Sequence, residues 1–179
     1  LKTWVEESGY PVIKLTRLNG TGPDSATTGS QIRFQQTRFL MRTGATRASH
    51  FDRIWHIPLT LTSGENGAIG GPTPSGQYKV CWIKTKEGDL STNGCPLDFG
   101  FPAQPPYSTN EDAQRNFIVA NVQQTGFYRV NYDGENWKRI SEFLSNPVQV
   151  NFIDEVSRGQ LIDDAFNLAR YDIKNLSAN

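Results

Sequence analysis

The sequence predicts a mainly β protein, in which an antiparallel β-sandwich is followed by short α-helices that begin a helical domain. Three observations support this fold class. Short segments before residue 133 alternate apolar and polar residues, which is the period of a strand with one buried face. Turn residues separate these segments with no helical pattern between them, which favours an antiparallel arrangement over a parallel sheet. Beyond residue 133 the apolar residues recur at helical spacing.

The change of period falls where a strand, a turn and a helix start meet. Tyr128, Val130 and Tyr132 share one face of a predicted strand. Asp133 follows directly and is a residue type that caps helix N-termini. The helix is expected to end before Pro147, which cannot continue it.

The earlier strands are predicted from the same alternation, at residues 11–18, 31–35, 55–62, 78–82 and 117–122. The alternation slips before Phe39, which predicts a bulge or two short strands. Pro58 has no amide hydrogen to donate, so its strand is expected at a sheet edge. Residues 89–97 are expected to return antiparallel to the strand before them, and the Gly-rich residues 63–76 to form a surface loop.

Both ends of the chain carry incomplete helical patterns. Residues 1–8 resemble the last turns of a helix closed by Gly9, too short to bury Trp4 alone, so they are expected to be the tail of an upstream element. Ser157 is predicted to cap a later helix. That helix carries a wide apolar arc that needs partner helices, formed by Leu161, Ile162, Ala165, Phe166, Leu168 and Ala169.

Composition restricts the partners and the compartment. Eighteen basic and eighteen acidic residues give zero net charge, which excludes a nucleic-acid or anionic-lipid surface. No apolar run approaches the roughly 20 residues of a membrane span. Cys81 and Cys95 predict a disulfide across a hairpin, with two isolated thiols as the alternative. With the glycosylation patterns at Asn19 and Asn175, the cysteines favour an extracellular protein.

No catalytic constellation is evident in the sequence. A zinc-protease helix requires two His residues four apart with a Glu between them, whereas His50 and His56 are six apart. Adjacent helical residues point about 100° apart, so Asp163 and Asp164 are not expected to converge on one bond. They are expected to form a solvated or interdomain polar face. We therefore assign no catalytic and no metal-binding residue.

The strand face with Phe127, Arg129 and Asn131 is neither plainly apolar nor plainly polar. Two interpretations remain open. In the first, the face docks on another domain, where Arg129 finds a carboxylate or a carbonyl group. In the second, it is an exposed strand face.

An ordered set of segments resembles one family. These segments are Trp4 with residues 9–13, the sequence WHIPLT at 55–60, GFYRVNYD at 126–133 with Asn136 and Trp137, and RGQLIDDAFNLAR at 158–170. Together they resemble the zinc aminopeptidases of the aminopeptidase N type, a gluzincin family. The departures are small, with Ser157 and Gly159 where the family usually has Asn and Ala before Gln160.

The resemblance implies three parts. Residues 1–8 would be the tail of an upstream catalytic domain, residues 9–133 a β-sandwich third domain, and residues 134–179 a linking helix with the first helix of a C-terminal helical domain. The family's zinc ligands and substrate-anchoring loop lie upstream, so this chain itself is expected to hold no cofactor, and zinc would belong to the parent protein.

The resemblance also implies surroundings and partners. Within the family, the amino-acid sequence looks most like the arthropod gut-surface members. Those proteins are anchored in the plasma membrane and lie on its extracellular face, and some of them bind bacterial toxins. The expected partners are the adjacent catalytic and helical domains, peptides for the parent protein, and a protein toxin. The residues expected to dock on neighbouring domains are Arg129, Asn131, Leu161 and Phe166.

The sequence therefore favours a non-catalytic interdomain scaffold from a zinc metalloaminopeptidase that releases N-terminal amino acids from peptides. The alternative is a stand-alone immunoglobulin-like module that binds a ligand or a toxin through loops such as residues 64–76. A third interpretation, a small enzyme in its own right, is disfavoured by the missing catalytic constellation.

Overall fold

The computed structural model describes residues 2–6, 8–18, 31–40, 54–63, 80–91, 93, 95 and 117–176. Within these residues the strands form a four-stranded sheet in the order β5-β2-β1-β7 and a three-stranded sheet in the order β4-β3-β6. The mainly β fold class is confirmed. The strands are β1 (Tyr10–Leu18), β2 (Gln31–Phe39), β3 (Ile57–Ser63), β4 (Val80–Ile83), β5 (Glu87–Asp89), β6 (Ile118–Ala120) and β7 (Arg129–Tyr132).

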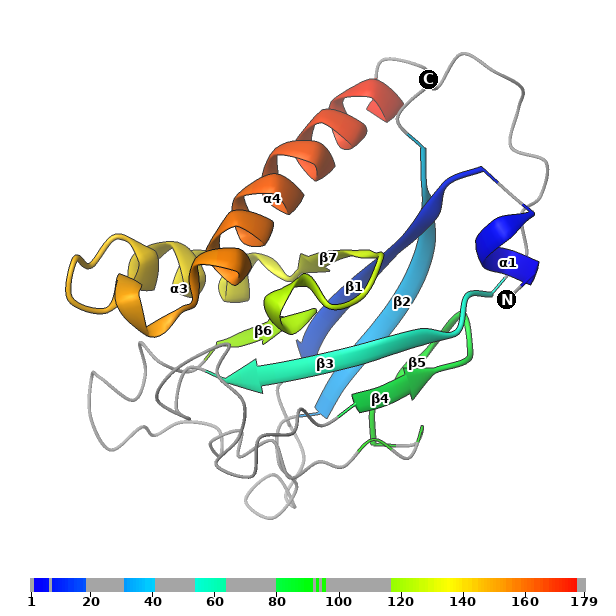
Figure 1. Ribbon diagram of the computed structural model, residues 1–179, viewed down its shortest axis with the longest axis horizontal. Coiled ribbons are helices and arrows are strands. Elements are labelled where there is room, and N and C mark those ends of the chain that lie inside the picture. Colours follow the sequence, from blue (N-terminus) through cyan, green and yellow to red (C-terminus); the bar gives the residue numbers. More distant parts are fainter. Residues whose placement is uncertain are drawn as a thin grey trace.

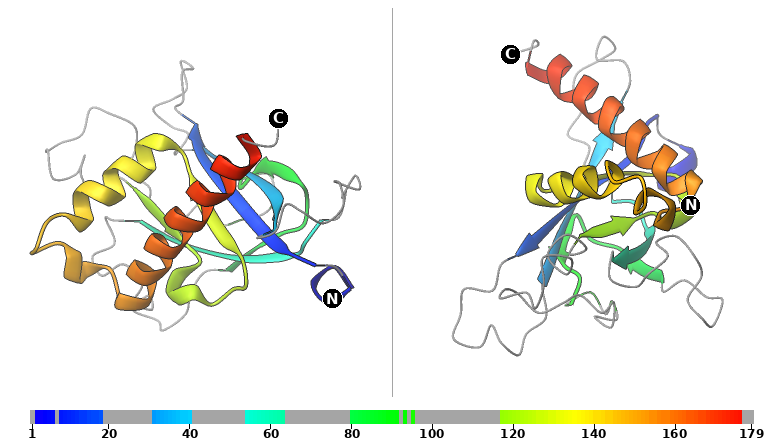
Figure 2. Two further views of the ribbon diagram at one scale, coloured as in Figure 1. Left: turned by 90° about the horizontal axis from the view of Figure 1, so that it is seen from above. Right: turned by 90° about the vertical axis from the view of Figure 1, so that its left-hand side faces the viewer.

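The described α-helices precede β1 or follow β7 along the chain, and one short 3-10 turn lies between β6 and β7. The helices are α1 (Lys2–Val5), α3 (Gly134–Leu144) and α4 (Glu155–Leu176), with 3-10 turns η2 (Val122–Gln124) and η3 (Val150–Phe152). Figure 1 shows α4 lying over β7 and β1, on the side of the four-stranded sheet that faces away from β3, and the views of Figure 2 agree. No helix in the described part of the chain is long and apolar enough to cross a membrane.

Two clusters of buried side chains hold these layers together. The larger one lies between the sheets and includes Ile13, Phe34, Trp55 and Leu59. It also contains Ile140 and Phe143 of α3 and Leu161 of α4, so both helices share the core of the sheets. The smaller cluster, Val12, Phe39 and Leu168, joins the outer face of the four-stranded sheet to α4.

The pairing of strands is mostly antiparallel. β1 is central in its sheet, since it pairs antiparallel with β2 along its whole length and parallel with β7 from Val12 to Leu15. β7 is therefore the one strand in the described part of the chain that departs from the predicted antiparallel pattern. Its exposed edge faces α4, and this arrangement builds the site described below.

The predicted bulge in the second strand is wrong. β2 is continuous, and its register with β1 runs without interruption from Gln31 to Phe39. The apparent slip has two causes. Gln36, a polar residue, occupies a core-facing position with 3% exposure, where its amide bonds Trp55. Phe39 lies on the opposite face of the strand and packs in the cluster beneath α4.

The predicted edge position of β3 is also wrong. β3 is the central strand, with β4 on one side and β6 on the other. Its partners cover different halves, since β4 pairs from Ile57 to Thr60 and β6 from Leu61 to Ser63. Within the described part of the chain, Pro58 lies in the half of β3 that has a strand on one side only, which is where a residue without an amide hydrogen is tolerated.

Cys81 and Cys95 form the predicted disulfide, with their Cα atoms 5.1 Å apart. Among the described residues no hairpin joins β4 to β5, because β5 pairs with β2 of the other sheet and not with β4. The disulfide therefore joins β4 to the segment that follows β5. Cys81 faces the core, which leaves the alternate residues Val80 and Trp82 exposed on the outer face of β4.

The helix starts show one correct and one wrong prediction. Asp133 caps α3, since its Oδ1 accepts a hydrogen bond from the Asn136 amide at 2.9 Å. Ser157 does not cap α4. Asp154 takes that role by accepting from the Ser157 amide at 3.0 Å, and this leaves the Ser157 hydroxyl free to bond the Gln123 amide.

The connection between α1 and β1 is fixed by a glycine and an arginine. Gly9 has φ +95°, and a Cβ there would lie 2.7 Å from the Phe39 carbonyl oxygen. Arg38 donates from Nε to the Ser8 carbonyl oxygen at 2.8 Å. The chain therefore leaves α1 and enters β1 in a defined direction.

Candidate functional site

The site begins with a backbone turn that ordinary residues rarely adopt. Asn121, Gln123 and Gln124 all have φ between 53° and 56°. Non-glycine residues in this left-handed region cost about 1–3 kcal/mol each and are found where the surrounding structure imposes them. The turn links β6 to β7, so it sets where β7 begins.

The side chain of Asn121 holds the turn from inside. It is fully buried, and its Nδ2 donates to the carbonyl oxygens of Gly126 at 2.9 Å and Tyr128 at 3.1 Å. Its Oδ1 accepts from the Gly126 amide at 2.8 Å. Gly126 has no room for a side chain, because a Cβ there would lie 2.2 Å from the Tyr128 ring.

Other elements hold the turn from outside. In β3, the Thr60 carbonyl oxygen accepts from the Asn121 amide and the Thr60 hydroxyl accepts from the Val122 amide, both at 2.9 Å. In α4, the Ser157 hydroxyl accepts from the Gln123 amide at 3.1 Å. The strained turn is thus the point at which the three-stranded sheet, β7 and α4 meet.

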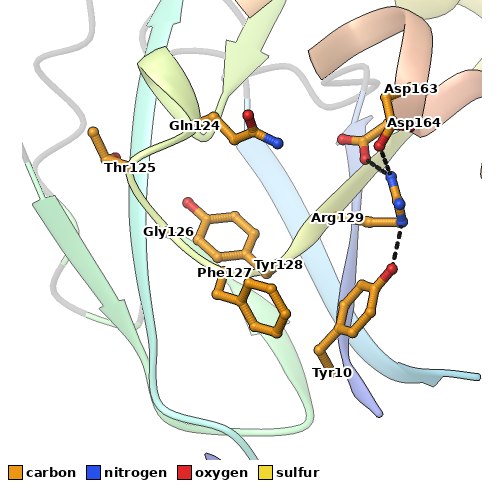
Figure 3. Close-up of a pocket in the computed structure, with 9 residues that line it drawn as sticks. All are labelled: Tyr10, Gln124, Thr125, Gly126, Phe127, Tyr128, Arg129, Asp163 and Asp164. Carbon is orange, nitrogen blue, oxygen red and sulfur yellow. Dashed lines mark hydrogen bonds and ion pairs between the residues drawn. The ribbon is translucent and has the colours of Figure 1, made fainter. Parts of the chain in front are cut away.

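Arg129 joins β7 to α4 at this point (Figure 3). Its Nη1 donates to Asp163 at 2.6 Å and to Asp164 at 2.8 Å, and its Nε donates to the Tyr10 hydroxyl at 2.8 Å. The guanidinium carbon also lies 5.7 Å from the centre of the Tyr10 ring and 5.2 Å from that of Phe39. A cation near ring faces is attracted by their negative charge density.

Asp164 is the buried end of this ion pair. Its side chain is 4% exposed, whereas that of Asp163 is 53% exposed. The second oxygen of Asp164 accepts from the Val130 amide at 3.0 Å, which satisfies an amide on the free edge of β7. This bond blocks the edge against pairing with another strand.

The electrostatics of the pair follow from burial and partners. Burial raises the pKa of Asp164, and the Val130 amide, Arg129 and Gln160 oppose that rise only partly. Burial lowers the pKa of Arg129, but its hydrogen bonds to Asp163, Asp164 and Tyr10 outweigh this effect, so its pKa is raised overall. These contacts therefore favour the charged form of Arg129.

Two buried tyrosines complete the polar framework without titrating. The Tyr128 hydroxyl donates to the Pro58 carbonyl oxygen at 3.0 Å, and the Tyr132 hydroxyl accepts from the Ala120 amide at 2.8 Å. Burial raises the pKa of both Tyr128 and Tyr132 above the usual tyrosine value. Both hydroxyls remain neutral and serve as hydrogen-bonding groups between strands.

A pocket of about 310 Å³ opens beside the turn. Figure 3 shows the rings of Tyr10, Phe127 and Tyr128 on one part of its wall and the Arg129 ion pair on another. Gln124, Thr125 and Gly126 of the turn complete the lining, with Asp163 and Asp164 from α4.

The residues predicted to dock on other domains have four different environments. Arg129 docks on α4 of this same chain. Asn131 accepts hydrogen bonds from Trp137 Nε1 at 3.0 Å and from the Tyr132 amide at 2.9 Å, so it ties β7 to α3. Leu161 is buried in the main core with 2% exposure, and Phe166 on the opposite face of α4 is 75% exposed.

Asp163 and Asp164 form a polar face, as expected, and this face contacts β7. Both carboxylates bond the same nitrogen of Arg129, although adjacent helical residues point in different directions. They converge because the long Arg129 side chain reaches α4 from β7 and ends between them. The sequence alone does not show that β7 and this part of α4 are neighbours.

Some predicted residues lie outside the described part of the chain. Asn19, His50 and the loop at 64–76 are among them, and Asn175 lies within the span of α4 with a side chain that is not described. Cys81 and Cys95 are bonded to each other. Among the described residues, no group of three or more His, Cys, Asp or Glu side chains is placed to hold a metal ion.

Sequence reasoning missed Asn121, Thr60 and Gln160. Gln160 is 4% exposed and donates to the Ala120 carbonyl oxygen at 3.3 Å. Asn is the non-glycine residue that best tolerates the left-handed region, so Asn121 beside a strand end was an available signal. Thr60 and Gln160 read as ordinary polar residues, and only the tertiary contacts reveal their role.

The geometry defines a class of protein, a two-sheet β domain whose last strand is tied by buried polar contacts to the first long helix that follows it. Residues 117–177, which span β6 to the end of α4, match the family model of the ERAP1-like C-terminal domain. The match therefore includes the strained turn at Asn121, strand β7, and the carboxylates of Asp163 and Asp164.

Curated relatives extend the similarity over nearly the whole chain. Aminopeptidase N of Plutella xylostella is 29% identical over 170 residues, which cover 95% of this chain and 14% of that protein. Aminopeptidase Ey of Gallus gallus is 29% identical over 93% of this chain and 13% of that protein. The thyrotropin-releasing hormone-degrading ectoenzyme of Mus musculus is 30% identical, with the same coverage.

These similarities confirm the resemblance to proteins of the aminopeptidase N type, and the chain aligns with a segment of such proteins. It spans about one seventh of the length of the relatives it matches.

Proposed function

We propose that this chain is a non-catalytic interdomain scaffold within a zinc metalloaminopeptidase, a parent enzyme that removes N-terminal residues from peptides. The observation that carries the proposal is the junction of the sandwich with α4. One face of α4 is fixed to β7 and the turn by Asp164, Gln160 and Ser157, each less than 5% exposed. A helix held in this way has a set direction relative to the sheets.

The opposite face of α4 supports a further domain on the other side. Ile162 is 55% exposed and Phe166 is 75% exposed. Large apolar side chains on the far face of a helix are costly in an independent domain and typical of an element covered by neighbours. In this proposal, further helices of the parent protein cover them.

The beginning of the chain supports an equivalent role on the upstream side. Gly9 and the Arg38 bond to Ser8 fix the direction in which α1 meets β1. In this proposal α1 belongs to the catalytic domain, so the sandwich would hold the catalytic and helical domains at a constant angle.

The surroundings proposed for the parent follow from the relatives. One of them is described by its name as an ectoenzyme. We place the parent on the extracellular face of the plasma membrane, with zinc in its catalytic domain, the Cys81–Cys95 disulfide in this segment and glycans at Asn19 and Asn175. We also propose that the parent presents a surface on which a toxin or another ligand docks.

The test starts from native material. An antibody raised against this chain captures the native protein, whose size and activity on a leucine anilide are then measured. We expect a species several times larger than 20.0 kDa whose activity is removed by a zinc chelator and restored by zinc. The 179-residue chain alone, supplied with zinc, serves as the control and should show no turnover.

Two results would change this conclusion. A native species of about 20.0 kDa without activity would favour the stand-alone immunoglobulin-like binding module. Zinc-dependent turnover by the chain alone would instead revive the small-enzyme interpretation.

A further inference from the structure

We propose that the pocket beside the strained turn binds the cationic end of a lysine or arginine side chain presented by a peptide. This inference concerns a ligand site on the sandwich itself and does not depend on whether the parent protein is a peptidase. It is based on the walls of the pocket, the balance of charge around it and the way its shape is fixed.

The walls suit a cation on an apolar stem. Tyr10 of β1 and Phe127 of the turn contact each other, with ring centres 5.1 Å apart, and Tyr128 adds a third ring. Phe127 is 73% exposed, so a ligand can reach it. Aromatic rings attract ammonium and guanidinium groups and also cover the methylene groups that carry them.

The balance of charge favours the same ligand. Two carboxylates and one guanidinium line the pocket, so its charged groups sum to one negative charge. The side chain of Arg129 is only 14% exposed, and its guanidinium is already engaged by both carboxylates and by Tyr10. The half-exposed carboxylate of Asp163 is the group that an entering cation meets.

The shape of the pocket is set before a ligand arrives. Asn121 fixes the turn through three hydrogen bonds, and Ser157 and Thr60 hold its other amides. A preformed site avoids the entropy cost of ordering a loop on binding. The cavity of about 310 Å³ lies at the lower end of the range of small-ligand sites, which suits one side chain better than a larger molecule.

The test titrates the ¹⁵N-labelled 179-residue chain with N-acetyl-lysine amide and N-acetyl-arginine amide, and follows amide chemical shifts by NMR. N-acetyl-norleucine amide, which has the same stem as lysine without the charge, is the neutral control. We expect saturable shifts in residues 124–129 with the cationic probes, weaker binding at high salt, and much smaller shifts with norleucine. The tighter of the two cationic probes identifies the side chain that the pocket prefers.

Two pairs of variants assign the effect to the pocket. Asp163→Asn and Phe127→Leu should each weaken binding about two- to fivefold. Glu155→Gln removes the same charge from a 92% exposed position of α4, and Phe166→Leu removes a ring of similar exposure on its far face. These controls should leave binding unchanged.

The proposal would be overturned by equal shifts with norleucine amide, by the absence of saturable shifts in residues 124–129, or by a Phe127→Leu chain that binds as tightly as the wild type. An Asp163→Asn chain that keeps both its affinity and its salt dependence would also overturn it. None of these results bears on the captured enzyme activity, so failure here is distinguishable from failure of the proposed scaffold function.

Discussion

Replacing Arg129 by Met tests the junction between the sandwich and α4 most directly. Met keeps an apolar stem but removes the charge, which leaves the 4% exposed carboxylate of Asp164 without its cation. Breaking a buried ion pair from one side costs about 3–5 kcal/mol. Asp164 keeps its bonds from Val130 and Gln160, so we expect the lower end, a loss of about 3 kcal/mol in the free energy of unfolding.

Urea unfolding at neutral pH measures this loss, and Arg139→Met is the matched control. The Arg139 side chain is 19% exposed, close to the 14% of Arg129, but its partner Glu135 is 61% exposed. Removing an arginine from an exposed pair should cost less than about 1 kcal/mol. Equal losses in the two variants would show that burial of Asp164 does not determine the result.

The pH dependence gives a second and independent check. The pKa of Asp164 is raised in the folded state, so its contribution to stability is present below the unfolded carboxyl pKa and lost as pH rises through the folded pKa. Without Arg129 that folded pKa rises further. The cost of Arg129→Met should therefore be largest at neutral pH and shrink towards pH 4. A cost that does not change with pH, or that grows on acidification, would refute this reasoning.

Three further perturbations test other parts of the structure. Asn121→Ala should lower the free energy of unfolding in urea by about 3–5 kcal/mol, because it leaves buried groups unpaired. Asn121→Gly should lower it by about 1 kcal/mol less, because glycine tolerates the left-handed region. Equal losses would show that φ strain is not a factor. The double variant Ile162→Ser and Phe166→Ser should keep the free energy of unfolding within about 0.5 kcal/mol of the wild-type value, since both side chains are exposed. It should also reduce self-association in sedimentation. A large loss of stability would mean that both side chains are buried in solution. Replacing Cys81 and Cys95 by Ser should lower the free energy of unfolding by about 3 kcal/mol, because the two cysteines are 14 residues apart in sequence and their bond closes the loop between them. The loss is measured as a lower Tm. An unchanged Tm would mean that the disulfide is not formed in solution.

Local patterns were sufficient for much of the fold. Alternation placed β1, β3 and β7, and the face of Trp55, Ile57 and Leu59 is buried as predicted. The cap at Asp133 was predictable because a cap depends on residues that are neighbours in sequence. The resemblance to the aminopeptidase N type was carried by the order of short segments, which is also a property of the sequence.

Tertiary structure decided what local patterns cannot express. The bulge predicted before Phe39 was wrong because a helix far along the chain covers the outer face of β2, which makes an apolar residue favourable there. Ser157 was misassigned because its hydroxyl bonds an amide 34 residues away.

The candidate site belongs to this second category. Arg129 and the polar face of Asp163 and Asp164 were each singled out from the sequence, but the contact between them was not, and the strained turn at Asn121 was not anticipated. The sequence determined the elements and their polar side chains, since these depend on spacing along the chain. Only the tertiary structure brought β7, the turn and α4 together, because burial and long-range hydrogen bonds depend on distances in space.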